Sequence, residues 1–233
     1  MQHPTPWYWE PFDLFQDAPP EASAAFFELT VRQKYARGDY IFMANDLGKR
    51  IFFLKEGVVK IFNLSPNGTQ TIFWFCVPGD VFGAGGISGS SFQHVYAQAV
   101  EPSIIHFIAR EDFEKAMKQY PQIAINMVRH MSARLRLACD SMVDISEHKA
   151  EARLARVLLR LAHNYGIQAA DRIELRMRVS HQELADMIGS SRQTVNAFLH
   201  EFSANGWIHL QGRTISIVSR GDLQEMIDRG RAE

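Results

Sequence analysis

Turn-forming residues interrupt the chain at short intervals between about residue 35 and residue 108. Apolar runs separated by turns roughly every 8–12 residues are typical of a β-sandwich or barrel and exclude long helices there. The Asn67-Gly68 pair between two apolar runs is a strong hairpin signal. The sequence predicts strands at residues 40–43, 51–55, 58–63, 69–77, 96–99 and 103–108.

A heptad pattern follows the strand-rich region. Pro121 stands where a first-turn proline favours a helix. Beyond it, apolar residues recur at alternating spacings of three and four, namely Val128, Met131, Leu135, Ala138, Met142 and Ile145. This strict period favours a long helix over residues 121–147 that pairs with a parallel partner helix in a dimer. A helix packed on its own β-domain remains the alternative.

The last third of the chain has the pattern of a winged helix-turn-helix. It predicts a helix at 149–165, a polar loop, two compact helices within 181–203, and two strands at 208–210 and 214–218. Ser180 and Glu183 form the pattern of a capping box, and Gly189 suits a left-handed helix end. We expect Ser190 and Gln193 to cap the second compact helix in the same way.

The second compact helix has one polar face. Arg192, Gln193, Asn196 and His200 fall opposite an apolar stripe. Arginine can pair with guanine, and glutamine or asparagine with adenine, in the DNA major groove. We expect phosphate contacts from Ser191, Thr194 and Arg213. The competing interpretation is an ordinary helical hairpin with a solvated polar face.

Composition excludes several other classes. A hydrophobic content of 46% supports an ordinary core, and the net charge of −1 leaves room for a local basic patch. Two cysteines without zinc spacing, no signal peptide and no long apolar run indicate a cytoplasmic protein with no membrane partner. We find no catalytic triad order, P-loop or dinucleotide fingerprint, so we expect no enzyme. The aromatic arm at residues 1–24 should pack on another part of the protein.

Several motifs together resemble one family. They are Gly38-Asp39-Tyr40-Ile41, Gly57-Val58-Val59-Lys60, Pro78-Gly79-Asp80-Val81-Phe82-Gly83, Ser180-His181-Gln182-Glu183-Leu184-Ala185, Gly189-Ser190-Ser191-Arg192-Gln193-Thr194-Val195 and Gly206-Trp207-Ile208. Over residues 25–220 the chain is similar to the cyclic-AMP receptor / fumarate–nitrate regulator family of bacterial transcription factors.

The resemblance implies an α+β chain with three folded parts: a cyclic-nucleotide-binding-type β-roll (jelly roll) at 25–120, a dimerisation helix at 121–147 and a winged helix-turn-helix at 148–233. It also implies a homodimer on a two-fold symmetric double-stranded DNA operator, with a small effector and RNA polymerase as further partners. A ligand-binding module without DNA function is the remaining alternative.

The chain departs from the cyclic-AMP-binding members of this family. Gly83-Ala84-Gly85 lacks their glutamate, Phe92-Gln93-His94 lacks their arginine, and Ala138 with Cys139 replaces their helix hydroxyls. A buried phosphate without a cation is costly, which argues against cyclic AMP. Two cysteines cannot hold a four-cysteine iron–sulfur cluster.

The resemblance and strand alternation together imply an apolar effector pocket. Its expected walls are Ile61, Trp74, Cys76, Ala84, Phe92, His94, Tyr96, Arg134 and Ala138. Three possibilities stay open: a small effector that is aromatic or carries one anionic group for Arg134, haem held by a histidine, and a pocket filled by side chains. In the helix expected to enter the groove, Gln193 and Ala197 replace the family's Glu and Arg, so the DNA half-site should differ at its inner positions.

Overall fold

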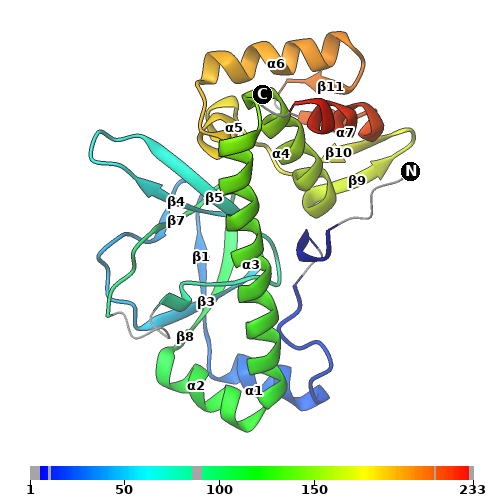
Figure 1. Cartoon of the computed structure of the whole chain (residues 1–233). Helices are drawn as coiled ribbons and strands as arrows, with labels where there is room; N and C mark the ends of the chain where they lie inside the picture. Colours follow the sequence, from blue (N-terminus) through cyan, green and yellow to red (C-terminus); the bar gives the residue numbers. More distant parts are fainter. Residues whose placement is uncertain (1–5, 10–11, 86–90, 213, 231–233) are drawn as a thin grey trace. The chain divides into compact units, whose positions relative to one another are not determined.

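The computed structural model describes residues 6–9, 12–85, 91–212 and 214–230 (Figure 1). The chain forms two compact units. The first, Pro11–Arg134, is called the β-roll unit below. The second combines Met1–Glu10 with Leu135–Glu233 and is called the helix-turn-helix unit. Within the described residues, no helix is long and apolar enough to cross a membrane.

Two antiparallel sheets of four strands each build the β-roll unit. Their orders are β1-β8-β3-β6 and β2-β7-β4-β5. The strands are β1 Val31–Tyr35, β2 Tyr40–Phe42, β3 Arg50–Glu56, β4 Val59–Leu64, β5 Gln70–Cys76, β6 Val81–Phe82, β7 Tyr96–Ala99 and β8 Ser103–Ala109. The hairpin at Asn67-Gly68 joins β4 to β5 as predicted, and Gly68 has a φ of +83°.

The sequence did not predict β1 and β6. Four of the five residues of β1 are exposed, so this strand has no apolar alternation that could identify it. It forms through antiparallel pairing with β8, in the register Val31↔Phe107 to Tyr35↔Ser103. The two-residue strand β6 pairs with β3 in the same way. Both strands therefore depend on partners distant in sequence.

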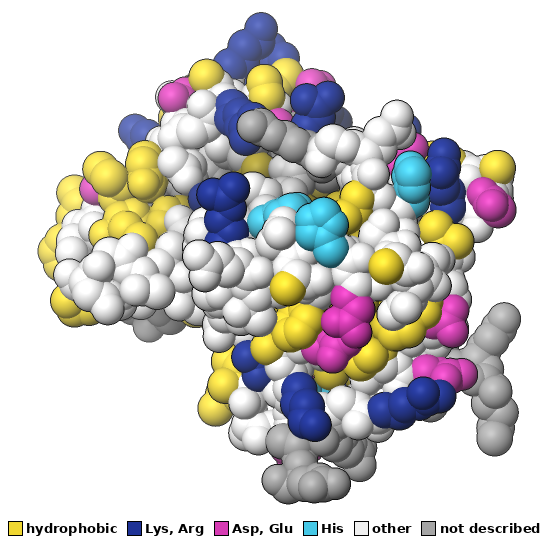
Figure 2. Space-filling view, turned by 90° about the horizontal axis from the view of Figure 1, so that it is seen from above, with side chains coloured by type: hydrophobic (Ala, Val, Ile, Leu, Met, Phe, Trp, Pro, Cys, Tyr) yellow, Lys and Arg dark blue, Asp and Glu magenta, His cyan; other side chains and the backbone are white. Residues whose placement is uncertain are grey.

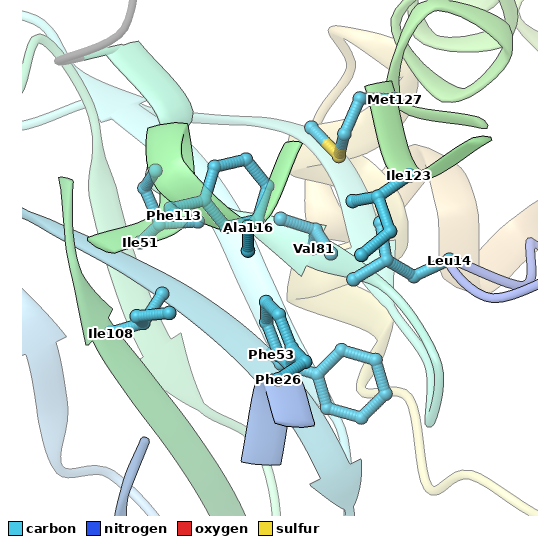
Figure 3. Close-up of a cluster of buried hydrophobic side chains, with 10 residues drawn as sticks. All are labelled: Leu14, Phe26, Ile51, Phe53, Val81, Ile108, Phe113, Ala116, Ile123 and Met127. Atoms are coloured by element: carbon cyan, nitrogen blue, oxygen red, sulfur yellow. The ribbon is translucent and has the colours of Figure 1, made fainter. Parts of the chain in front are cut away.

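The sheet that contains β3 is covered on both faces. One face meets the other sheet in a core made of Phe42, Phe52, Leu54, Val59, Ile61, Cys76, Phe82, Ala97 and Ile105. The other face meets helices α1 (Pro20–Glu28), α2 (Arg110–Gln119) and α3 (Pro121–Glu147) in the cluster of Figure 3. This double coverage explains why residues 51–54 of β3 are all buried.

Helix α3 starts at Pro121, as the sequence predicts, and runs for 27 residues. In its first half Ile123 and Met127 enter the cluster of Figure 3. His130, one turn further on, is also buried. The apolar heptad residues lie on a different face of the same helix.

The helix-turn-helix unit contains the predicted winged helix-turn-helix. It comprises α4 (Ala150–Tyr165), β9 (Gly166–Ala169), β10 (Arg172–Leu175), α5 (His181–Ile188), α6 (Arg192–Ala204), β11 (Ile208–Gln211), β12 (Thr214–Ile217) and α7 (Arg220–Arg229). The sheet order is β11-β12-β10-β9. The expected polar loop after α4 is wrong in part, because β9 and β10 pair there and extend the wing sheet. Helix α7, which the sequence did not predict, packs on α4.

Candidate nucleic-acid interface

Helix α5 is capped at both ends. At the start of α5, Ser180 Oγ accepts from the Glu183 amide at 3.2 Å, and Glu183 Oε2 accepts from the Ser180 amide at 2.9 Å. The predicted capping box is therefore confirmed. Gly189 ends α5 with φ 62° and ψ 49°, which is the left-handed conformation that glycine adopts without a steric penalty.

The cap of α6 lies one residue later than the sequence predicted. Ser191, not Ser190, is the N-cap, and its Oγ accepts from the Thr194 amide at 3.0 Å. The Ser190 amide instead donates to the Ala185 carbonyl and closes the turn. Gln193 is consequently not a capping residue, and its side chain is exposed. The hydroxyls of Ser191 and Thr194 also contact each other at 2.8 Å, so any phosphate would share them with the cap.

Helix α6 separates its apolar and polar residues cleanly. Val195, Leu199 and Phe202 are fully buried. Arg192, Gln193, Asn196 and His200 are exposed, while Thr194 is half-buried. Residues four apart lie on one side of a helix, so Arg192, Asn196 and His200 form one row that starts at the helix N-terminus. These side chains are free to reach a groove because the opposite face anchors the helix.

The wing next to this helix is a β-hairpin. Strands β11 and β12 pair from Ile208↔Ile217 to Gln211↔Thr214, and Gly212 takes a φ of +62° in the turn. The predicted phosphate contact Arg213 lies outside the described residues. On the face seen in Figure 2, Lys, Arg and His side chains are interspersed with hydrophobic and acidic side chains.

The heptad residues of α3 form an exposed apolar row, called the α3 seam below. Val128 and Leu135 each expose 66% of their surface, Met142 72% and Ile145 63%, and Met131 and Ala138 are also exposed. Isolated exposed apolar residues are common, but a row on one helix face indicates an interaction surface. The buried face of α3 and its seam are distinct, so this helix packs on its own β-roll unit and still keeps the seam open.

The structure brings only some of the predicted pocket residues together. Ile61 and Trp74 pair across β4 and β5, and Cys76 lies beside them in the inter-sheet core. Ala84 packs instead against the helix-side cluster. Phe92 and His94 are exposed, Tyr96 stacks on Phe62 with a centroid distance of 5.2 Å, and Ala138 belongs to the other unit.

Arg134, the expected anion receptor, already has an anionic partner. Its Nη2 lies 2.5 Å from Asp80 Oδ2, and its guanidinium lies over the Trp74 ring at 5.3 Å from the centroid. The Asp80 side chain is 3% exposed and also accepts from the Val77 amide at 2.9 Å. In the sequence, Asp80 stands out only as part of the motif at residues 78–83, because its partner lies 54 positions away.

His130 completes this buried cluster. Its Nε2 lies 3.0 Å from the Val81 carbonyl, and its Nδ1 lies 4.0 Å from Asp80 Oδ1. Burial, together with the nearby charge of Arg134, lowers the pKa of His130 to about 4, although Asp80 acts in the opposite direction. The ring is therefore neutral at pH 7, and its Nε2–H donates to the carbonyl.

The stretch that binds the cyclic phosphate in the resembled family has different chemistry here. Gln93 is 3% exposed and donates from Nε2 to the Gly83 carbonyl at 3.2 Å. It offers an amide where a phosphate would require a cation. Burial also raises the pKa of the Cys76 thiol, so this sulfur stays protonated. Among the residues that the structure describes, no three His, Cys, Asp or Glu side chains gather as a metal site.

Comparisons with known proteins agree with this architecture. The family model described as "Cyclic nucleotide-binding domain" matches residues 32–120, and the "Crp-like helix-turn-helix domain" matches residues 152–226. A "CRP-like cAMP-activated global transcriptional regulator" of Mycobacterium tuberculosis is 27% identical over 94% of this chain and 96% of its own length. The "Fumarate and nitrate reduction regulatory protein" of Escherichia coli is 25% identical over 82% of this chain and 76% of its own.

A solved structure shares the fold. FixK2 from Bradyrhizobium japonicum superposes with a TM-score of 0.75 at 23% identity, covering 84% of this chain and 96% of that one.

Proposed function

Because this chain belongs to the cyclic-AMP receptor / fumarate–nitrate regulator (CRP/FNR) family of DNA-binding transcription regulators, we propose that it reads a specific DNA sequence as a homodimer under the control of a small effector at its β-roll. One observation carries this proposal. The exposed row of Arg192, Asn196 and His200, with Gln193 beside it, starts at the N-terminus of α6 that Ser191 caps, and the opposite face of the helix buries Val195, Leu199 and Phe202.

The chemistry of that row suits the major groove. Arg192 offers a bidentate fork to guanine O6 and N7, and Gln193 and Asn196 can each pair with adenine. The amides at the start of α6 and the hydroxyls of Ser191 and Thr194 suit phosphate oxygens. Each of these groups lies in the first turns of α6, the part of a recognition helix that contacts base edges.

The α3 seam supports the homodimer. Apolar residues at alternating spacings of three and four on an exposed helix face match a second copy of the same helix. A two-fold symmetric dimer would present two copies of α6 to two half-sites. RNA polymerase is the further partner that we expect for such a regulator.

Cyclic AMP does not fit the β-roll of this chain, although the name of the mycobacterial relative attaches cyclic AMP to that protein. Gln93 supplies no cation for a phosphate, and Asp80 already neutralises Arg134. An anionic effector would have to compete with Asp80 for Arg134. An effector-independent regulator is the second candidate, because aromatic side chains fill the space between the sheets, with Phe52 and Phe82 stacked at 5.4 Å.

A DNA-selection experiment tests the DNA-reading proposal. The full chain selects duplexes from a random pool, and its affinity for the selected duplex is measured by gel shift at two salt concentrations. A protein with six or more phosphate contacts loses roughly a thousandfold or more between 50 and 200 mM salt.

Arg192→Ala should weaken specific binding by about 1–3 kcal/mol, which is roughly 5- to 150-fold. Arg229→Ala is the matched control, because Arg229 is an exposed arginine of the same unit that pairs with Glu225 on α7. If Arg192→Ala binds the selected duplex as tightly as the control, α6 is not the recognition helix.

A spectroscopic experiment tests the effector. The purified protein is examined for a visible absorption spectrum and for co-purified small molecules by mass spectrometry. A Soret band would identify haem, and a bound small molecule would identify the effector class. Neither signal, combined with selected-duplex binding by the protein as purified, would favour the effector-independent regulator.

A further inference from the structure

The aromatic N-terminal segment is anchored on the helix-turn-helix unit. The turn η1 (Trp7–Trp9) packs on α4. The Tyr8 hydroxyl donates to Asp140 Oδ2, and Arg136 both pairs with Asp140 at 3.1 Å and lies over the Tyr8 ring. The rings of Trp9 and His163 lie 6.1 Å apart. The segment therefore contacts the second half of α3 and the first helix of the DNA-binding part.

The electrostatics of this first anchor keep the Tyr8 hydroxyl protonated. Burial and the hydrogen bond to Asp140 both raise the pKa of Tyr8, and Arg136 opposes them less strongly. The phenol therefore remains a donor across the physiological pH range. An interaction with a carboxylate is among the stronger hydrogen bonds in proteins.

The residues that follow are anchored in the β-roll unit. The centroids of the Phe12 and His130 rings lie 4.0 Å apart, and Leu14 is fully buried in the cluster of Figure 3. Asn126, which is 1% exposed, donates from Nδ2 to the carbonyls of Leu14 at 3.0 Å and Gln16 at 2.7 Å. This second anchor thus includes the histidine beside Asp80 and Arg134.

A short length of chain joins the two anchors. Trp9 and Phe12 are three positions apart, so their Cα atoms cannot lie more than roughly 11 Å from each other. That limit depends on the number of residues and not on the conformation of Glu10 and Pro11, which lie outside the described residues. The two units are also joined at Arg134 and Leu135 within α3. The chain therefore connects them twice.

We propose that residues 6–17 act as a strap, which holds η1 on the helix-turn-helix unit and Phe12 and Leu14 in the β-roll unit and so restrains the movement of one unit relative to the other. The connection through α3 is a continuous helix, which can still bend and twist, and a second connection removes part of that freedom. Because its second anchor contacts His130, the strap also links the buried Asp80–Arg134 pair to the DNA-binding part. The effect of the strap on DNA binding rests on the function proposed above.

Lengthening the strap tests the restraint without removing either anchor. Insertion of Gly-Ser-Gly between Glu10 and Pro11 adds roughly 10 Å of reach. The same insertion immediately before Pro6 is the matched control, because it leaves the length between the anchors unchanged. A second variant, Tyr8→Phe combined with Trp9→Ala, releases the first anchor instead.

The first readout needs no DNA. Spin labels at Lys115→Cys and His209→Cys, in a Cys139→Ser background, report the distance between the units, and dilution with unlabelled chain isolates the distance within one chain. Cys76 is fully buried and should not react. We expect the distance distribution to broaden with the insertion after Glu10 and with the anchor variant, but not with the control insertion. Equal widths in all four proteins would overturn the strap.

The second readout is affinity for the selected duplex. Lengthening the strap should change it by about threefold or more, because apparent affinity follows the fraction of chains in the competent arrangement. A smaller change means that the strap does not influence DNA binding, and overturns that part of the proposal. If the unmodified chain selects no duplex, the proposed function fails while the spin-label result still decides on the strap.

Discussion

Replacement of Leu135 by alanine should separate the two interpretations of the α3 seam. Leu135 exposes 66% of its surface. Full burial of a leucine contributes roughly 1.5–3 kcal/mol, so burial of the exposed two-thirds contributes roughly 1–2 kcal/mol per chain. A two-fold interface contains the residue twice, so Leu135→Ala should weaken the dimer by roughly 2–4 kcal/mol. The dimer dissociation constant then rises roughly 30- to 900-fold.

Sedimentation velocity over a range of protein concentrations measures that constant directly. Leu29→Ala is the matched control, because Leu29 is an exposed leucine at the end of α1, away from the seam. The control should dimerise like the unmodified chain. Both variants should unfold in urea with nearly unchanged stability once the contribution of dimer dissociation is removed.

Two outcomes would refute the dimer interpretation. If Leu135→Ala dimerises as tightly as Leu29→Ala, the α3 seam is not the interface. If it lowers the stability of the monomer and leaves association unchanged, α3 uses this face to pack on its own chain. Each outcome would require a different surface for presenting two copies of α6.

Three further predictions, one of them with a control substitution, concern the buried cluster and the base preference. The pKa of His130 is about 4 in the folded chain and 6.5 in the unfolded chain, so between these pH values only the unfolded chain binds the proton. The free energy of unfolding should therefore fall by about 3 kcal/mol from pH 6.5 to pH 4. Urea titrations at several pH values should show a smaller fall for His130→Gln. Arg134→Gln leaves the buried Asp80 carboxylate without its cation and should cost roughly 3–5 kcal/mol of unfolding free energy. Arg229→Gln, which breaks the exposed pair with Glu225, should cost less than about 1 kcal/mol. Gln193→Glu should move the base selected opposite this position from adenine toward cytosine in pool sequencing, and an unchanged base would show that Gln193 does not read it.

Local signals in the sequence predicted the local structure well. The capping box of Ser180 depends on residues three apart, and the hairpin at Asn67-Gly68 depends on two adjacent residues. The α6 cap was predicted one residue too early, because Ser190 and Ser191 are both good cap residues. In the structure the Ser190 amide donates to the Ala185 carbonyl, which places Ser190 in the turn and leaves Ser191 as the N-cap.

Features that depend on distant partners could not be predicted in the same way. Strand β1 is polar and exposed, and only its ladder with β8 reveals it. Arg134 and Trp74 were both expected in the pocket wall, and the guanidinium lies over the Trp74 ring, but the partner Asp80 lies 54 positions away in the sequence and gives no local signal. The sequence therefore predicted the kind of fold and the candidate DNA-reading face, and missed the internal neutralisation of its expected anion receptor.

The ion pair between Arg134 and Asp80 limits how an effector can act through Arg134. A ligand anion that takes over the guanidinium leaves the Asp80 carboxylate buried, and a buried charge without a partner costs several kcal/mol. The Val77 amide already donates to Asp80, and Nδ1 of the neutral His130 lies 4.0 Å from Asp80 Oδ1. Movement of the Arg134 guanidinium away from this cluster would remove one of the charges that lower the pKa of His130. His130 could then take up a proton and compensate Asp80. A ligand shifts a conformational equilibrium only through its different affinities for the two states. An anionic effector should therefore bind together with this proton, and the affinity of the protein for the effector should increase as the pH falls.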